Sequence, residues 1–252
     1  MLPVRPKKSL GQHFLNDQNI ARKIAGSLQF ADEKAVVVEI GPGSGFMTQY
    51  LVDQPFRLLL IETDRESIEY LHQRFPQMNE NIFHRDVLSV KLTDFSEKPM
   101  SIIGNMPYNI SGPLLFMALE QRDMVSEWIG MLQKEVAERI TAKPSTKAYG
   151  ILSVLLQAYF TTEFLFTVPP SVFIPPPKVN SAVIRMVPKA SDVPQCEYAQ
   201  FKSLVKTAFN QRRKTMRNSL KNFFEPEILT NPVFNKRPEE LTWQEFEALL
   251  SL

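Results

Sequence analysis

Residues 35–45 read Ala-Val-Val-Val-Glu-Ile-Gly-Pro-Gly-Ser-Gly, and this stretch decides the fold. Its β-branched run predicts a buried strand that ends at Ile40, followed by a glycine turn and a helix over about 46–52. A strand, a glycine turn and a helix together begin a nucleotide-binding βαβ unit. The dinucleotide fingerprint G-x-G-x-x-G does not fit, because the glycines stand at 41, 43 and 45. Glu39 before the turn favours a cationic nucleoside such as S-adenosylmethionine (SAM) over a pyrophosphate. A glycine turn used only for packing is the alternative.

Acidic residues follow the next two predicted strands. Glu62 ends a strand over 57–61 and stands 21 positions after Gly41, while Asp86 follows a short strand over 81–84. An acid about 20 residues after the glycine turn is placed to accept hydrogen bonds from ribose hydroxyls. An acid at the tip of the third strand can accept from an adenine amino group. Either residue alone is better explained as a solvated carboxylate at a strand end, but two at successive strand tips favour a site.

A second motif, Ser101-Ile-Ile-Gly-Asn-Met-Pro-Tyr108, follows a fourth predicted strand. Asn105 supplies a side-chain carbonyl, Pro107 fixes the backbone angle of the turn, and Tyr108 supplies an aromatic face. Two carbonyl acceptors that converge on an exocyclic amine, beside a stacking ring, can hold a nucleobase amino group for attack on an electrophile. A tight turn after a strand is the structural alternative.

A proline-rich loop over 169–180 carries Phe173. So many prolines predict a stiff, extended loop. From such a loop an aromatic side chain can stack on an unpaired base, a contact worth about 1–3 kcal/mol. Phe173 can equally be a buried plug beneath the loop, and the sequence does not decide between the two.

The totals limit the class of protein. The chain has 252 residues, a formal net charge of +2, one cysteine (Cys196) and three histidines without an H-x-x-x-H pair. No internal disulfide is possible, and we expect no metal site. No apolar run reaches the roughly 20 residues that span a bilayer, and no secretion signal follows the basic N-terminus. We therefore expect a cytoplasmic protein without a membrane segment.

The alternation of strands and helices up to about residue 188 predicts one α/β doubly wound sheet, and the composition then changes. From Tyr198 to Phe224 there are seven basic residues and no acidic one. Six polar residues fall on one predicted helical stripe opposite a buried side, and such a single-sign stripe favours binding to RNA phosphates over a merely solvated face. The stripe consists of Lys202, Lys206, Asn210, Lys214, Arg217 and Lys221. We expect two domains, 1–188 for SAM binding and catalysis and 195–252 as a small helical RNA-binding domain.

The ordered set of motifs resembles the KsgA family of small-subunit ribosomal RNA adenine N6,N6-dimethyltransferases. The matching pieces cover nearly the whole chain: Lys8-Ser-Leu-Gly-Gln-His-Phe-Leu15, Glu39-Ile-Gly-Pro-Gly-Ser-Gly45, Glu62, Asp86, Asn105-Met-Pro-Tyr108, Pro170-Ser-Val-Phe-Ile-Pro-Pro-Pro-Lys-Val-Asn-Ser-Ala182 and Phe209-Asn-Gln-Arg-Arg-Lys-Thr-Met-Arg-Asn-Ser219. The resemblance implies a Rossmann-like class I methyltransferase sheet. It also implies an enzyme that uses SAM to add two methyl groups to each of two adjacent adenosines near the 3′ end of 16S rRNA. This reaction belongs to ribosome biogenesis, and the partner is the 30S subunit or its precursor.

The resemblance also implies roles for individual residues. His13 and Leu15 close over the cofactor, Gly41 and Gly43 admit its methionyl part, Glu62 holds the ribose, and Asp86 holds the adenine. Asn105 touches both the cofactor and the target amine, the Pro107 region grips the same amine, and Tyr108 and Phe173 sandwich the target base. Met106 departs from the expected Leu or Ile, a volume-conserving change that should cost little. His13 stands where some relatives carry Asn, and outside the resemblance it is more simply a packed or surface histidine.

Two other functions fit parts of the sequence. An Erm-type 23S rRNA methyltransferase is built from the same parts, although the Phe-Ile-Pro-Pro-Pro-Lys loop and the Asn-Gln-Arg-Arg-Lys segment favour the small subunit. A ribosome-assembly factor whose binding matters more than its catalysis is the second, but a pure scaffold would not need Glu62, Asp86 and Asn105. We expect a monomer.

Overall fold

The computed structural model describes residues 4–211 and 214–252. The chain forms two compact units: Met1–Ala137 with Glu163–Pro188, and Glu138–Thr162 with Lys189–Leu252. The ranges predicted from sequence, 1–188 and 195–252, differ from these units in residues 138–162, which belong to the second unit. That segment contains α5 (Ile151–Tyr159), whose contacts are with helices of the C-terminal part of the chain.

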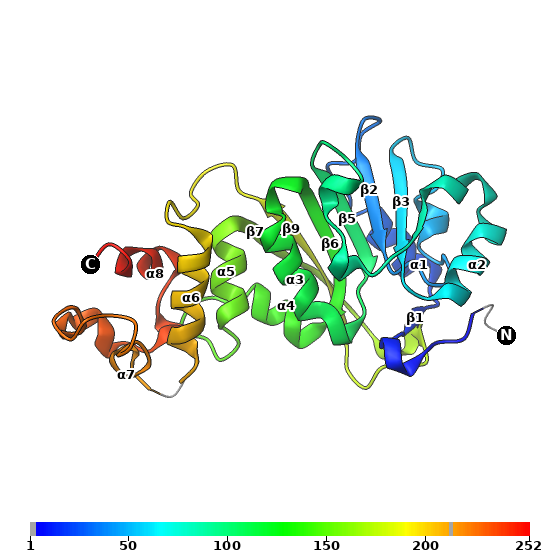
Figure 1. The fold of residues 1–252 in the computed structure, drawn as a ribbon. Helices are drawn as coiled ribbons and strands as arrows, with labels where there is room; N and C mark the ends of the chain where they lie inside the picture. The colour runs from blue at the N-terminus through cyan, green and yellow to red at the C-terminus, as the bar shows by residue number, and fades with distance from the viewer. Residues whose placement is uncertain (1–3, 212–213) are drawn as a thin grey trace. The chain divides into compact units, whose positions relative to one another are not determined.

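The first unit is built on a seven-stranded sheet (Figure 1). Four neighbouring pairs of strands are parallel, and β6 (Val125–Gln133) and β9 (Ser181–Pro188) pair antiparallel. In their order across the sheet the strands are β4 (Ile82–His84), β3 (Arg57–Glu62), β2 (Val36–Ile40), β5 (Met100–Asn105), β6 (Val125–Gln133), β9 (Ser181–Pro188) and β7 (Phe160–Val168).

The direction in which strands are added reverses between β2 and β5. These two strands are direct neighbours, with Val37 opposite Ser101 and Glu39 opposite Ile103. In open α/β sheets the ligand crevice lies outside the carboxyl ends of the strands at such a switch point. The glycine turn and the Asn-Met-Pro-Tyr turn therefore lie beside each other because of the topology alone.

Both faces of the sheet are buried. Val37, Leu60 and Ile103 pack into a core cluster with α1 (Gln18–Ala25) and α2 (Arg65–Arg74), while their neighbours in the chain, such as Val38, are also fully buried. A parallel sheet that is covered on both sides needs such continuous apolar runs. The third helix of this unit, α3 (Ser111–Glu120), is apolar on nearly all sides, and α4 (Lys134–Ile140) follows β6 directly.

One predicted helix is absent. After the glycine turn the chain forms a 3-10 helix, Thr48–Tyr50, and not the regular helix expected over 46–52. A short two-stranded sheet, β1 (Phe14–Leu15) with β8 (Phe173–Ile174), then joins the N-terminal segment to the proline-rich loop.

The C-terminal unit is helical, with α5, α6 (Tyr198–Phe209), α7 (Met216–Ser219) and α8 (Trp243–Leu249). The predicted buried side is confirmed, since all seven of its apolar residues are buried: Phe201, Leu204, Val205, Ala208, Phe209, Met216 and Leu220. The predicted continuous basic stripe is wrong, because α6 ends at Phe209 and Lys214 lies outside any helix. Arg212 and Arg213, in the same basic run, lie outside the described residues.

Within the described part of the chain, no helix is long and apolar enough to cross a membrane. In residues 4–211 and 214–252 there is also no group of three or more His, Cys, Asp and Glu side chains that could hold a metal ion.

Candidate active site

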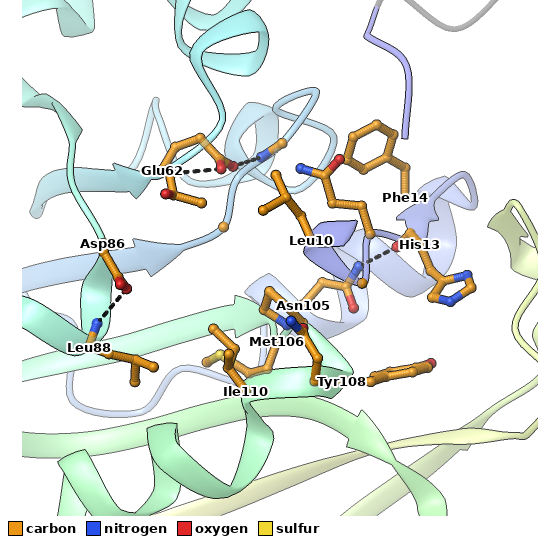
Figure 2. Close-up of a pocket in the computed structure, with 17 residues that line it drawn as sticks. Leu10, His13, Phe14, Glu62, Asp86, Leu88, Asn105, Met106, Tyr108 and Ile110 are labelled. Atoms are coloured by element: carbon orange, nitrogen blue, oxygen red, sulfur yellow. Dashed lines mark hydrogen bonds between the residues drawn. The ribbon is translucent and has the colours of Figure 1, made fainter. Parts of the chain in front are cut away.

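A pocket lies at the carboxyl ends of β2, β3, β4 and β5 and is closed by the N-terminal segment (Figure 2). Most of the residues predicted from sequence meet there. Its lining consists of Leu10, Gly11, Gln12, His13, Phe14, Gly41, Gly43, Glu62, Thr63, Asp86, Leu88, Asn105, Met106, Pro107, Tyr108, Asn109 and Ile110. None of these residues is lysine or arginine and two are carboxylates, so the pocket suits a cationic ligand better than a phosphate.

The glycine turn brings the backbone close to the pocket. Gly43 has a φ of +54°, and a Cβ built there would lie 2.7 Å from a ring carbon of Phe14. A side chain at this position would be strained and would displace the ring. The turn is therefore shaped both by backbone conformation and by the N-terminal segment that packs on it.

Glu62 is 4% exposed and is fixed by the backbone around it. Its Oε2 accepts a hydrogen bond from the Gly43 N–H at 3.0 Å, and its Oε1 accepts from the N–H groups of Thr63 and Asp64, each at 2.8 Å. Burial raises the pKa of Glu62, and these three backbone bonds oppose that shift. The carboxylate is held rigidly at the tip of β3 and faces the pocket.

Asp86 lies at the tip of β4 and is exposed. Its Oδ1 accepts from the Leu88 N–H at 3.0 Å and so caps the 3-10 turn Val87–Ser89 (Figure 2). A carboxylate has a second oxygen with its own lone pairs. That oxygen is available to a ligand in the pocket.

Asn105 ends β5 and binds the N-terminal segment. Its Nδ2 donates a hydrogen bond to the backbone carbonyl of His13 at 2.8 Å (Figure 2). Because the amide nitrogen donates to His13, the amide oxygen Oδ1 points away from the His13 carbonyl. Oδ1 can then accept a hydrogen bond from another group. Next in the turn, the carbonyl of Pro107 accepts from the Ile110 N–H at 3.2 Å.

Tyr108 is held from two sides. Its hydroxyl and that of Ser181, on β9, lie 2.5 Å apart, and its ring stacks on His13 with centroids 5.4 Å apart and an interplanar angle of 30°. Burial raises the pKa of the Tyr108 hydroxyl, while the hydrogen bond with Ser181 opposes the shift. His13 Nδ1 is 2.8 Å from the Pro175 carbonyl, which fixes the imidazole against the proline-rich loop.

Two predicted site residues do not line the pocket. Leu15 is 5% exposed and Phe173 is 2% exposed, and both belong to the core cluster. They face each other in the register of β1 and β8. Successive residues of a strand point to opposite sides, so Phe14 turns toward the pocket while Leu15 turns into the core. Of the two alternatives for Phe173, the structure has the buried plug.

Several lining residues were not predicted from sequence, among them Leu10, Phe14, Thr63, Leu88 and Ile110. Leu88 carries the clearest sequence signal, because it is a large apolar residue two positions after the acid at a strand tip. In the structure its side chain is 38% exposed. Leu10 and Phe14 are ordinary apolar residues whose position depends on the folded N-terminal segment, while Thr63 follows β3 directly and Ile110 ends the 3-10 turn Tyr108–Ile110.

The chain is similar to proteins of one family over almost its whole length. The profile of the family described as ribosomal RNA adenine dimethylase matches residues 4–248. The Ribosomal RNA small subunit methyltransferase A of Flavobacterium johnsoniae is 49% identical over 253 residues, covering 99% of this chain and 96% of that protein. The protein of the same name from Cytophaga hutchinsonii is 47% identical over 254 residues, covering 100% and 98%.

Solved structures share the fold. A dimethyladenosine transferase from Plasmodium falciparum superposes with a TM-score of 0.81 at 24% identity, covering 95% of this chain and 96% of that one. The 23S rRNA methyltransferase ErmE gives a TM-score of 0.69 at 24% identity, covering 95% and 100%. These likenesses confirm the predicted α/β class I methyltransferase fold. The family profile spans almost the entire sequence and the relatives match it end to end, so the chain belongs to the ribosomal RNA adenine dimethylase family.

Proposed function

We propose that this protein transfers methyl groups from SAM to the N6 amino groups of two adjacent adenosines near the 3′ end of 16S rRNA, during maturation of the 30S subunit. The single observation that carries the proposal is the meeting of Glu62, Asp86 and Asn105 in one pocket of a chain that belongs to this family. The relatives named as small-subunit methyltransferases support the choice of rRNA.

The pocket fits SAM on chemical grounds. Gly41 and Gly43 line the pocket with left-handed backbone, φ +65° and +54°, so the turn can offer backbone contact to the methionyl part of the cofactor. Glu62 would accept from the ribose hydroxyls and Asp86 from the adenine amino group. His13 would close the pocket on the side of the N-terminal segment. SAM, when bound, supplies a methyl group on a positively charged sulfur that is already a good leaving group.

The target amine would be held by two acceptors. The first is Asn105 Oδ1, whose direction follows from the bond between Nδ2 and the His13 carbonyl. Because the Pro107 carbonyl already accepts from the Ile110 N–H and from the Ser111 hydroxyl, we take the backbone carbonyl of Met106 as the second acceptor. The ring of Tyr108 would stack on the adenine, which must first leave its RNA stack at a cost of a few kcal/mol.

The chain needs no strong base for this reaction. The amine proton can pass to solvent after the methyl group has moved, so the protein acts by aligning nitrogen, methyl and sulfur. Proximity and orientation of this kind are worth up to about 7–11 kcal/mol. We do not assign the predicted base-stacking role to Phe173, because this residue is only 2% exposed.

The two ranges 1–188 and 195–252 are proposed as the catalytic and the rRNA-binding domain. The support for the second is charge, since the segment from Tyr198 to Phe224 has no acidic residue. Each phosphate that its lysines and arginines neutralise would release counterions and make binding depend on salt.

The decisive experiment supplies methyl-labelled SAM and 30S particles from cells that lack the activity. We expect label on two adjacent adenosines near the 3′ end of 16S rRNA, and none with the Asn105→Ala protein. Protein-free 23S rRNA is the competing substrate, and preferential labelling there would favour an Erm-type enzyme. If Asn105→Ala protein binds the particles normally and still supports subunit maturation, the assembly-factor alternative would be favoured instead.

A further inference from the structure

The N-terminal segment, residues 7–14, forms one wall of the pocket but is tied down outside it. Residues 10–14 line the pocket, whereas Lys7 does not. The Lys7 ammonium group forms an ion pair with the carboxylate of Asp64 and lies 3.5 Å from a carboxylate oxygen of Glu66. The wall is thus attached to the loop that follows β3.

Asp64 is not an ordinary surface partner. It is only 3% exposed, and its second oxygen accepts from the Ser67 hydroxyl at 3.0 Å. Burial raises the pKa of Asp64, but the hydrogen bonds from Lys7 and Ser67 outweigh burial and the net pKa is lowered. A buried carboxylate that loses its cation is costly, so Lys7 is strongly held in place.

The pair is also coupled to the pocket through the backbone. The N–H of Asp64 donates to Glu62 Oε1 at 2.8 Å, so the residue that holds Lys7 also orients the acid at the tip of β3. The N–H of Lys7 donates to Gln12 Oε1 at 2.8 Å, and this hydrogen bond within the segment holds Gln12 close to Lys7. At its other end the segment is fixed by the bond from Asn105 to the His13 carbonyl.

We infer that Lys7 and Asp64 are positioning residues, whose ion pair holds residues 10–14 against the bound cofactor and thereby sets the affinity for SAM. Neither side chain lines the pocket. Both therefore affect the cofactor indirectly, by fixing the positions of Gln12, Phe14 and Glu62, which do line it. The inference rests on the proposed function in one respect, that SAM is the ligand of the pocket.

The test compares single variants in the full-length protein. Lys7→Met removes the charge and keeps the stem, and Asp64→Asn removes the charge at constant size. We expect each to raise the dissociation constant for SAM about tenfold, in the lower part of the range for coupled sites. In turnover assays the loss should fall on KM for SAM more than on kcat. Hydrogen exchange of the amides of residues 8–15 should become faster in the ligand-free protein.

Three further variants separate positioning from general damage. Lys7→Arg should restore tight binding, since it keeps the cation. The double variant Lys7→Met with Asp64→Asn should be no worse than either single one, because the two residues act as a unit. Arg65→Ala is the control, because it breaks an exposed ion pair of 3.0 Å between Arg65 and Glu69, both on α2. It should leave the SAM dissociation constant and the hydrogen exchange of residues 8–15 at wild-type values.

Wild-type affinity in Lys7→Met, or unchanged exchange of residues 8–15, would overturn the inference while leaving the proposed cofactor intact. A wild-type protein that binds no SAM would overturn the cofactor instead, and with it this role. If Arg65→Ala weakened SAM binding as much as Lys7→Met, the loss of any charge near α2 would have the same effect. That result would also overturn the inference.

Discussion

The side-chain amide of Asn105 donates a hydrogen bond to the backbone carbonyl of His13, 2.8 Å away, across 92 positions of the chain. One bond thus joins the Asn-Met-Pro-Tyr turn to the N-terminal wall of the pocket. It also decides which way the amide oxygen points, because an amide nitrogen can only donate. The same residue therefore has two separable duties, to present an acceptor and to hold a wall.

Replacing Asn105 with Ala should abolish most turnover. Without Oδ1 the target amine loses an acceptor that aligns it, and misplacement by about 1 Å can cost about 10²-fold in rate. The affinity for SAM, measured by calorimetry, should fall far less than turnover, since Glu62 and Asp86 are untouched and the pocket wall loses only the bond to the His13 carbonyl. Turnover equal to wild type would refute the amine-gripping role.

Asn105→Asp tests the second duty. It keeps an acceptor for the amine but cannot donate to the His13 carbonyl. We expect more residual turnover than in Asn105→Ala together with weaker SAM binding. A variant with wild-type SAM affinity would show that the bond to His13 is not needed for the pocket.

Asp86→Ala should weaken SAM binding about tenfold, since a hydrogen bond to a charged acceptor is worth about 1.5–3 kcal/mol. The variant also loses the cap on the Leu88 N–H, which complicates a stability comparison. Asp17 is a matched control, because it caps α1 by accepting from the Ile20 N–H at 3.0 Å and does not line the pocket. Each cap lost should cost about 1 kcal/mol of stability, but only Asp86→Ala should change the dissociation constant. Equal dissociation constants for the two variants would remove Asp86 from the site.

Much of the site could be predicted because it depends on local pattern. Gly41, Glu62 and Asp86 each follow a recognisable strand, and parallel strands bring their carboxyl ends to one edge of a sheet. Asn105 could be placed beside them for the same reason. The sequence could not specify that Asn105 also holds His13, because that contact depends on how the N-terminal segment returns to the pocket.

The sequence is a poorer guide where contacts between distant parts of the chain determine the position of a residue. Phe173 could stack or be buried, and its pairing with Leu15 in β1 and β8, far apart in the chain, buries it. The prediction of one basic stripe rests on the helical spacing of its residues, and residues 209–215 contain neither glycine nor proline that would interrupt a helix. α6 nevertheless ends at Phe209, and nothing in the local composition signals that end.

Tyr108→Phe should separate the hydroxyl of this residue from its ring. The phenylalanine keeps the stacking face and loses only the bond to Ser181, so kcat should fall far less than in Tyr108→Ala. Ser181→Ala removes the other half of the same bond and should have an equal effect. The double variant should then be no worse than either single one, which is the signature of one shared interaction. Additive losses in steady-state kinetics would mean that the two hydroxyls act independently.

Glu39 gives a prediction about stability and pH. This residue is 1% exposed on β2, and the Thr48 hydroxyl donates to it at 2.7 Å. Burial raises the pKa of Glu39 to about 8 from its ordinary 4.5, the charge of Glu62 adds to the rise, and the bond from Thr48 opposes it. Between these two pH values the folded protein holds a proton that the unfolded chain has released. Stability should therefore fall as pH rises through this window, by at most about 1.4 kcal/mol per pH unit, and level off above it.

Glu39→Gln removes the titrating group and keeps an oxygen that accepts from Thr48. Its free energy of unfolding in urea, relative to wild type, should increase steadily from about pH 5 to pH 8 and then stay constant. Glu69→Gln, on the exposed face of α2, is the control for the substitution itself. Parallel curves of stability against pH for Glu39→Gln and wild type would show that the buried carboxyl does not titrate in this window.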